Sequence, residues 1–308
     1  LPLFGGSRNV RAHPAAKHMT LGDTTICTEG RRRYGGSMKP FLLITTRDDE
    51  AVAAAEHASY CQLTGLLPEE LEWRRIERAP LGPVDLDRYS GLILAGSPFT
   101  VSEPQSAKSD DELRVEHELG ILLDEVIVRD FPFLGICYGI GTIGAHQGAR
   151  VDRTFGEPPQ ATRVRLTAEG LVDPLLRELP DEFDAFVGHK EAISEVPPHI
   201  AVLAGSAACP VQAFRVGANV YSTQFHPELD TQTFASRVKA YAGHGYYEPD
   251  ELDSILNQID AVDVRASHMV LARFVEQYAR AEQAPTPVAA AVPVTVAIPT
   301  ATGTPQLA

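Results

Sequence analysis

The sequence predicts a three-layer α/β protein whose central sheet is mostly parallel and carries a smaller extension of mixed strands. Two observations support this prediction. Up to about residue 150, short apolar runs alternate with segments of helical composition, which is the pattern of parallel strands joined by crossover helices. From about residue 151 the apolar runs become shorter and are separated by turns, which indicates further strands in mixed orientation.

The first half of the chain provides the parallel part of the sheet. Its apolar runs predict strands over residues 41–46, 91–95 and 131–136. Helices are expected over 51–65, which ends at a glycine, over the amphipathic stretch 110–130, and from about residue 140 onward. Three strand ends therefore alternate with helices, as a doubly wound sheet requires.

The second half provides the mixed strands and two closing helices. Short strands are predicted over 163–166, 185–187, 202–204, 211–215 and 219–224, with a hairpin turn at 216–219 between the last two. Helices are predicted over 250–259 and 266–281. We find no internal repeat, so residues 38–283 are expected to form one domain.

The two ends of the chain differ in composition from this domain. Residues 1–37 are basic, rich in glycine and without periodicity, so we expect a disordered or non-native extension, with Met38 as the functional start. A basic targeting arm is the alternative. Residues 284–308 are rich in alanine and proline, and their prolines exclude a regular helix, so this tail is expected to be disordered.

Bulk properties narrow the class of protein. The net charge of −14 over 308 residues argues against a nucleic-acid binder or a protein of anionic membrane surfaces. No stretch of 18 apolar residues predicts a membrane span. The four cysteines are scattered without zinc spacing, which favours reduced thiols in a cytoplasmic protein. Nothing in the sequence indicates a metal or an organic cofactor.

Cys137 is the most informative residue of the chain. It ends the apolar run 131–136 and lies two positions before Gly139, close to where a helix is expected to begin. A cysteine at so sharp a strand-to-helix junction has the character of a nucleophile elbow, because small neighbours let the turn close and the sulfur projects from the sheet edge. The adjacent helix N-terminus favours the thiolate.

Two more segments follow predicted strands. His226 and Glu228 stand in Gln-Phe-His-Pro-Glu after the strand at 219–224, and a cysteine, a histidine and a carboxylate together form an activated-nucleophile triad. Gly96 and Ser97 end the strand at 91–95, where backbone N–H groups can form an oxyanion hole. Taken singly, these motifs would be a buried cysteine, a loop and a turn. Their joint occurrence at strand ends favours a catalytic site.

These segments together resemble the class I glutamine amidotransferases, and most closely the stand-alone members that are similar to the amidotransferase part of GMP synthase. The matching motifs are LILAGSP at 92–98, GICYG at 135–139, VGHKE at 187–191 and QFHPE at 224–228. The resemblance covers roughly residues 39–240. It implies a flavodoxin-like fold and an enzyme that releases ammonia from glutamine.

The resemblance also implies roles for individual residues. Cys137 would be the nucleophile, His226 the general base and Glu228 the acid that orients it. The oxyanion and substrate-binding positions would be Gly96, Ser97, Tyr138, Gly188 and His189, with N–H groups of Gly96 and Tyr138 facing the oxyanion and Gly188-His189 lining the glutamine pocket.

One position departs from the family pattern. The family usually has Gly-x-Cys-x-Gly-x-Gln, and this chain has Gly141 where the glutamine stands. We expect the missing side chain to open the pocket. This favours an alternative function, hydrolysis of larger γ-glutamyl compounds by the same triad. A catalytically silent binding module of the same fold is the third hypothesis.

The sequence also bears on whether the chain needs a partner protein. The sequence contains neither a GxxxxGK[ST] loop nor an SGGxDS-like loop, so we expect the ammonia-accepting synthetase to be a separate protein. The aromatic segment 241–247 fits either a surface loop or part of a partner interface, and the sequence leaves this open.

Overall fold

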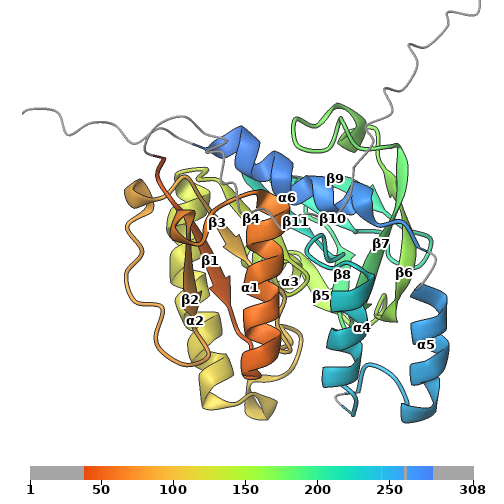
Figure 1. Ribbon diagram of the computed structural model, residues 1–308. Coiled ribbons are helices and arrows are strands. Elements are labelled where there is room, and N and C mark those ends of the chain that lie inside the picture. The colour runs from red at the N-terminus through yellow and green to blue at the C-terminus, as the bar shows by residue number, and fades with distance from the viewer. Residues whose placement is uncertain (1–37, 244, 260–261, 280–308) are drawn as a thin grey trace, which may run out of the picture. The chain divides into compact units, whose positions relative to one another are not determined.

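The computed structural model describes residues 38–243, 245–259 and 262–279 (Figure 1). Its main feature is a nine-stranded sheet with the strand order β2-β1-β3-β4-β11-β10-β9-β6-β7. The strands are β1 (Phe41–Thr45), β2 (Leu71–Arg75), β3 (Gly91–Leu94), β4 (Phe133–Ile136), β6 (Glu157–Leu166), β7 (Glu182–His189), β9 (Ile200–Gly205), β10 (Ala213–Val216) and β11 (Val220–Thr223). A separate pair is formed by β5 (Arg150–Asp152) and β8 (Ala192–Glu195).

The sheet has a parallel half and an antiparallel half. Strands β2, β1, β3, β4 and β11 pair in parallel with their neighbours in that order. From β11 onward, β10, β9, β6 and β7 pair antiparallel. The predicted fold class, a mostly parallel core with a mixed extension, is confirmed.

Helices cover both faces of the sheet (Figure 1). Helices α1 (Glu50–Thr64) and α6 (Arg265–Tyr278) pack on one face, and α2 (Asp110–Val128) and α3 (Tyr138–His146) pack on the other. Helices α4 (Thr231–Ala240) and α5 (Leu252–Ile259) lie against the antiparallel half, where Phe234 of α4 stacks on Phe186 of β7 with ring centroids 4.2 Å apart.

The strands are apolar throughout because both faces are covered. In β1, Phe41 and Leu43 belong to the cluster under α1 and α6, whereas Leu42 and Ile44 belong to the cluster under α2 and α3. Successive side chains of a strand point to opposite faces, so a strand between two helical layers has no polar side.

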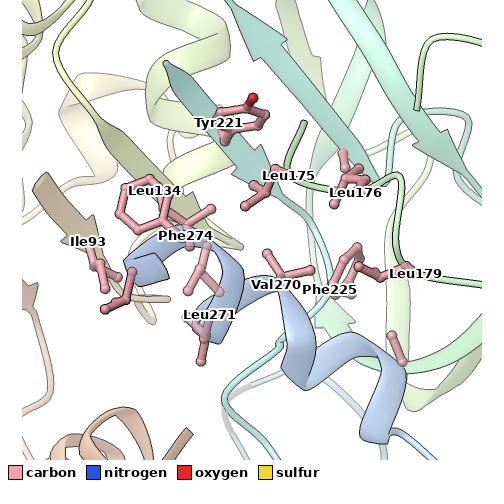
Figure 2. Close-up of a cluster of buried hydrophobic side chains, with 14 of the residues drawn as sticks. Ile93, Leu134, Leu175, Leu176, Leu179, Tyr221, Phe225, Val270, Leu271 and Phe274 are labelled. Carbon is pink, nitrogen blue, oxygen red and sulfur yellow. The ribbon is translucent and has the colours of Figure 1, made fainter. Parts of the chain in front are cut away.

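Helix α6 closes the first face with an apolar stripe. Figure 2 shows Val270, Leu271 and Phe274 directed at side chains of the sheet, and all three are fully buried. Their spacing along the chain places them on one side of the helix. This packing fixes α6 on one face of the sheet, in the same cluster as residues of β1, β3 and β4.

Several elements differ from the sequence-based expectation. Strands β2, β5 and β8 and helix α4 were not predicted. Strand β2 (Leu-Glu-Trp-Arg-Arg) lies at the sheet edge, where its partly buried positions tolerate charged side chains. The elbow strand begins at Phe133 rather than 131, and the following helix begins at Tyr138 rather than 140, since Cys137 alone makes the turn.

Two expectations about the ends of the chain, for residues 1–37 and 284–308, fall outside the described residues. Within the described part of the chain, no helix combines the length and apolar character needed to cross a lipid bilayer.

Candidate active site

Cys137 connects β4 to α3 in a single residue. Its backbone has φ 52° and ψ −86°, a conformation that non-glycine residues rarely adopt. Its N–H donates to the Thr223 carbonyl of neighbouring β11 at 2.7 Å. Helix α3 approaches β4 so closely that a Cβ atom on Gly135 would lie 2.8 Å from Ile143 Cδ1. The turn thus depends on the strained backbone of Cys137 and on the absence of a side chain at Gly135. It places Cys137 at the carboxyl edge of the sheet.

His226 and Glu228 lie at the end of the adjacent strand, β11. The Nδ1–H of His226 donates to Glu228 Oε1 at 2.8 Å, which directs the other ring nitrogen away from the carboxylate. Both residues are buried, and Glu228 is fully so. The Cys137 side chain lines the same cavity as the His226 ring, and its electrostatic interaction with the ring helps to raise the pKa of His226. The structure therefore places the imidazole and the carboxylate in hydrogen-bond contact, with Cys137 at the same cavity.

Electrostatic coupling among these three residues is strong. Burial lowers the pKa of His226, but attraction to Glu228 and Cys137 outweighs it and raises the pKa to about 9. Burial acts to raise the pKa of Glu228, but His226 and Arg237 hold it well below its usual range. At neutral pH the imidazole is therefore protonated and the carboxylate ionised.

A buried charge network continues from Glu228. Arg237 of α4 donates to Glu228 Oε1 at 2.7 Å and to Glu56 Oε1 of α1 at 2.8 Å. Glu56 also accepts from Arg47, which follows β1, at 3.1 Å, and Arg47 reaches the Tyr241 hydroxyl at 3.2 Å. Because ions taken out of water need partners, each member of this network depends on the next.

Gly96 lies between the catalytic candidates. A Cβ atom on Gly96 would stand 2.9 Å from His226 Cε1 and 3.5 Å from Cys137 Cβ. Among the described residues, neither the Gly96 N–H nor the Tyr138 N–H donates to a protein acceptor. Ser97 Oγ accepts from the Phe99 N–H at 3.0 Å, which shapes the loop after β3.

Two hollows meet at Cys137. We call the first the His226 hollow; it is lined by Arg47, Pro159, His226, Leu229, Phe234, Arg237, Val238, Tyr241 and Tyr247. The second, the Glu191 hollow, is lined by Phe99, Thr100, Tyr138, Ile140, Gly141, His189, Lys190, Glu191, Ala192 and Gln224. Both include Ser97, Cys137, Gly188 and Tyr246. Cys137 is thus accessible from two sides of different chemical character.

His189 borders the Glu191 hollow, but its ring is occupied within the protein. Its Nδ1 lies 2.9 Å from the Glu191 carbonyl and its Nε2 lies 3.1 Å from Glu157 Oε2. Glu191 in turn accepts from the N–H groups of Val101 and Ser102 at 2.8 and 2.7 Å. These bonds tie the segment after β7 to the loop after β3.

The expectation for Gly141 is wrong. A Cβ atom on Gly141 would lie 3.2 Å from Glu191 Oε1 and 3.3 Å from Val101 Cγ2. The missing side chain therefore does not open the pocket, because Glu191 and Val101 take up the space beside it.

One buried group has ligand types suited to a metal ion. Glu157, His189 and Cys209 have ligand atoms within 4.8 Å of one another. Burial raises the pKa of the Cys209 thiol to about 12, which disfavours the thiolate that a metal binds. Gln212 Nε2 already donates to Glu157 Oε2 at 2.7 Å. We therefore treat this group as a hydrogen-bonded part of the core.

Sequence reasoning missed four residues of the site: Arg47, Glu56, Arg237 and Tyr246. Arg47 closely follows β1, a parallel strand, and this position was a usable signal because sites gather at the carboxyl ends of such strands. The others come from helices α1 and α4 and from the segment before α5, and nothing local marks them. The aromatic segment 241–247 contributes to the walls of the site.

Comparison with known proteins bears on this arrangement. The family model described as glutamine amidotransferase class-I matches residues 70–240. A glutamine-hydrolyzing GMP synthase of Wolbachia pipientis wMel is 30% identical over 155 residues, which are 50% of this chain and 28% of that protein. The chain thus spans little more than a quarter of that relative.

A shorter relative is covered more fully. It is one subunit of the glutamine-hydrolyzing GMP synthase of Methanocaldococcus jannaschii, and it is 28% identical over 161 residues, covering 52% of this chain and 76% of that protein. A crystal structure of a glutamine amidotransferase from Thermotoga maritima superposes with a TM-score of 0.61 and 20% identity, over 78% of this chain and 98% of that one. It supports the fold.

Proposed function

Because the chain belongs to the class I glutamine amidotransferase family, we propose that it hydrolyses the side-chain amide of glutamine at Cys137. The observation that carries this proposal is the hydrogen bond between His226 and Glu228 at a cavity that Cys137 also lines. A cysteine beside a protonated imidazole is an activated nucleophile with a proton donor for the leaving group close by.

The reaction follows from these positions. The Cys137 sulfur attacks the amide carbon, and the C–O double bond becomes an oxyanion facing the N–H groups of Gly96 and Tyr138. His226 gives its proton to the nitrogen, the C–N bond breaks, and ammonia leaves. Water, deprotonated by the same imidazole, then cleaves the γ-glutamyl thioester to glutamate and the thiol. Loss of one oxyanion donor costs about 3 kcal/mol in such reactions.

The Glu191 hollow is the proposed site of the glutamyl chain. It contains Tyr138, Gly188 and His189, and its charged members Lys190 and Glu191 suit the α-carboxylate and α-amino group of glutamine. Since both nitrogens of the His189 ring are engaged by protein groups, we propose that His189 positions this wall and that backbone groups of the segment contact the substrate.

We further propose that the ammonia passes to a separate synthetase. The similarity to a protein named as one subunit of GMP synthase supports this, because that name describes one part of a larger enzyme. Mixing the purified chain with the synthetase half of such an enzyme should then permit glutamine-dependent GMP formation. Product formed from added ammonium but never from glutamine would contradict this partnership.

The test of the hydrolysis is direct. Purified protein incubated with glutamine should release ammonia and glutamate in equal amounts. Cys137→Ala should lower the rate at least about 1000-fold while the circular dichroism spectrum is retained. Cys61→Ala is the matched control, since Cys61 is a partly buried cysteine on α1 and not a wall of either hollow. Equal glutaminase rates in the two variants would refute the assignment.

A further inference from the structure

The two hollows at Cys137 contain different groups of the proposed reaction. The group that protonates a departing amine must face that amine, so the leaving group lies on the side of His226. His226 lines the first hollow and is not part of the second. The second contains Tyr138, whose N–H is the proposed oxyanion donor, together with the charged residues that suit the glutamyl chain.

The His226 hollow is larger than ammonia requires. It has room for about four water molecules, whereas the Glu191 hollow has room for about one or two. Ammonia needs the space of a single water molecule. The surplus is the space of about three water molecules, which suits a small alkyl group attached to the departing nitrogen.

The walls of the His226 hollow are mainly apolar. Leu229, Phe234 and Val238 are buried, and Tyr241, Tyr246 and Tyr247 add aromatic faces. The Tyr247 hydroxyl is already satisfied because it donates to the Val238 carbonyl at 2.7 Å. Such walls bind apolar groups through the area removed from water.

The charges in the His226 hollow are internally matched. Arg47 pairs with Glu56, and Arg237 pairs with both Glu56 and Glu228. His226 pairs with Glu228 and faces the Cys137 sulfur. Each cation of the cluster thus has a carboxylate partner within the protein, which leaves little attraction for a charged leaving group.

We propose that the His226 hollow is a leaving-group subsite for neutral apolar amines, so that the chain hydrolyses γ-glutamyl alkylamides in addition to glutamine. The proposal rests on the proposed function, because it uses the same thioester chemistry. Cys137 forms the S–C bond, the C–N bond breaks, the amine leaves with the proton of His226, and water releases glutamate.

A substrate series tests the subsite on the unaltered protein. We expect kcat/KM for γ-glutamyl isobutylamide to exceed that for γ-glutamyl methylamide at least about tenfold, since both are secondary amides and differ only in the buried carbons. γ-Glutamyl butylamide should likewise exceed its polar isostere, γ-glutamyl 3-hydroxypropylamide. Equal values in both pairs would overturn the proposal.

A charged counterpart checks the class of amine. γ-Glutamylvaline is the isobutylamide with a carboxylate added next to the nitrogen. We expect it to be the poorer substrate by about tenfold or more, because Arg47, Arg237 and His226 of this hollow are already paired with carboxylates of the protein. If it is the better one, the subsite selects amino acids and the proposal of a neutral amine fails.

Substitutions that change the size of the His226 hollow provide an independent test of the subsite. Val238→Phe should reduce the isobutyl-to-methyl ratio of kcat/KM to near one, and Val238→Ala should shift the preference to longer alkyl chains. Val128→Phe on α2 is the matched control, because Val128 is 86% exposed and lines neither hollow, and it should leave the ratio as in the parent protein. An unchanged ratio in both folded Val238 variants would overturn the proposal.

The outcomes separate the two proposals. Hydrolysis of glutamine with no gain for the isobutylamide leaves the amidotransferase assignment standing and removes the subsite. Failure to hydrolyse glutamine and every amide of the series removes both.

Discussion

Gly96 and His226 lie so close together that a Cβ atom on Gly96 would stand 2.9 Å from Cε1 of the imidazole. This is shorter than real Cβ contacts, so any side chain at position 96 displaces the ring from Cys137. The loop after β3 and the histidine after β11 are thus mutually constrained at the centre of the site.

We therefore predict that Gly96→Ala lowers the rate of glutamine hydrolysis about 100-fold or more, although alanine keeps the backbone N–H. The reason is displacement of the imidazole, since a shift of about 1 Å in a catalytic group can cost two orders of magnitude. Steady-state assays of ammonia release measure the effect.

Gly120→Ala on α2 is its control, because an added Cβ there meets nothing within 4 Å. It should leave the rate unaltered. Near-parental activity in Gly96→Ala would contradict the crowding between positions 96 and 226.

A second prediction concerns Arg237, which donates to Glu228 at 2.7 Å and to Glu56 at 2.8 Å. Arg237→Met removes one cation from between two buried carboxylates. We expect a loss of about 3 kcal/mol in the free energy of unfolding, because breaking a buried pair leaves uncompensated charge. Urea denaturation measures it.

The matched control is Arg265→Met at the start of α6. Arg265 pairs with Asp263 on the surface, where both side chains are more than half exposed. Such pairs contribute about 1 kcal/mol or less to the free energy of unfolding. If the two variants lose the same stability, the network does not stabilise the fold as described.

The third prediction is the pH dependence of His226. Its pKa is raised to about 9 in the folded protein, above the usual 6.5. The stabilisation from its partners is thus complete below pH 6.5 and is lost as the pH rises through about 9. Glutamine hydrolysis should fall over the same alkaline range, because the neutral imidazole no longer supplies a proton to the leaving nitrogen.

Glu228→Gln tests the cause of this shift. Attraction to Glu228 is the largest of the effects that raise the pKa of His226. The variant should titrate at a lower pH, which an NMR titration of the ring reports even when little activity remains. A midpoint identical to that of the parent protein would show that Glu228 does not set the protonation of the ring.

The fourth prediction concerns Gly141. Restoring the family's usual glutamine at this position should reduce activity, because its Cβ would meet Glu191 Oε1 at 3.2 Å and Val101 Cγ2 at 3.3 Å. Glu191 would then lose its bonds to the Val101 and Ser102 amides. We expect Gly141→Gln to raise KM for glutamine and lower the melting temperature.

Gly120→Gln provides the comparison, since position 120 has open space around an added Cβ. It introduces the same side chain into a helix at no cost in contacts. A Gly141→Gln variant with a lower KM than the parent protein would mean that the neighbouring side chains yield readily and that the site accepts the family's residue.

The sequence predicted the structure best where the local residue pattern determines the backbone conformation. The parallel strands and the elbow at Cys137 were predictable, because continuous apolar runs and a cysteine set between two nearby glycines leave few alternatives. Helix α4 was not, since only Phe234 and Val238 of its ten residues are buried, too few for a periodic pattern.

The charge network was beyond reach for a different reason. Arg47, Glu56 and Arg237 lie on three separate segments and meet only through the fold. Charged residues on helices are usually solvated, and nothing in the sequence distinguishes these from the rest. The space around Gly141 was misjudged likewise, because Glu191 lies 50 positions further along the chain and fills it from outside the helix.

Helix α4 has a consequence that extends beyond any one of its residues. It begins shortly after Glu228, and within two turns it delivers Arg237 to that carboxylate and Val238 to the wall of the His226 hollow. The proton affinity of His226 and the choice of substrate therefore depend on the same helix. A homologue in which this short helix is replaced so that another amine fits would also change the pKa of its histidine. Directed evolution of either property should therefore select substitutions in α4 that improve one property at the expense of the other.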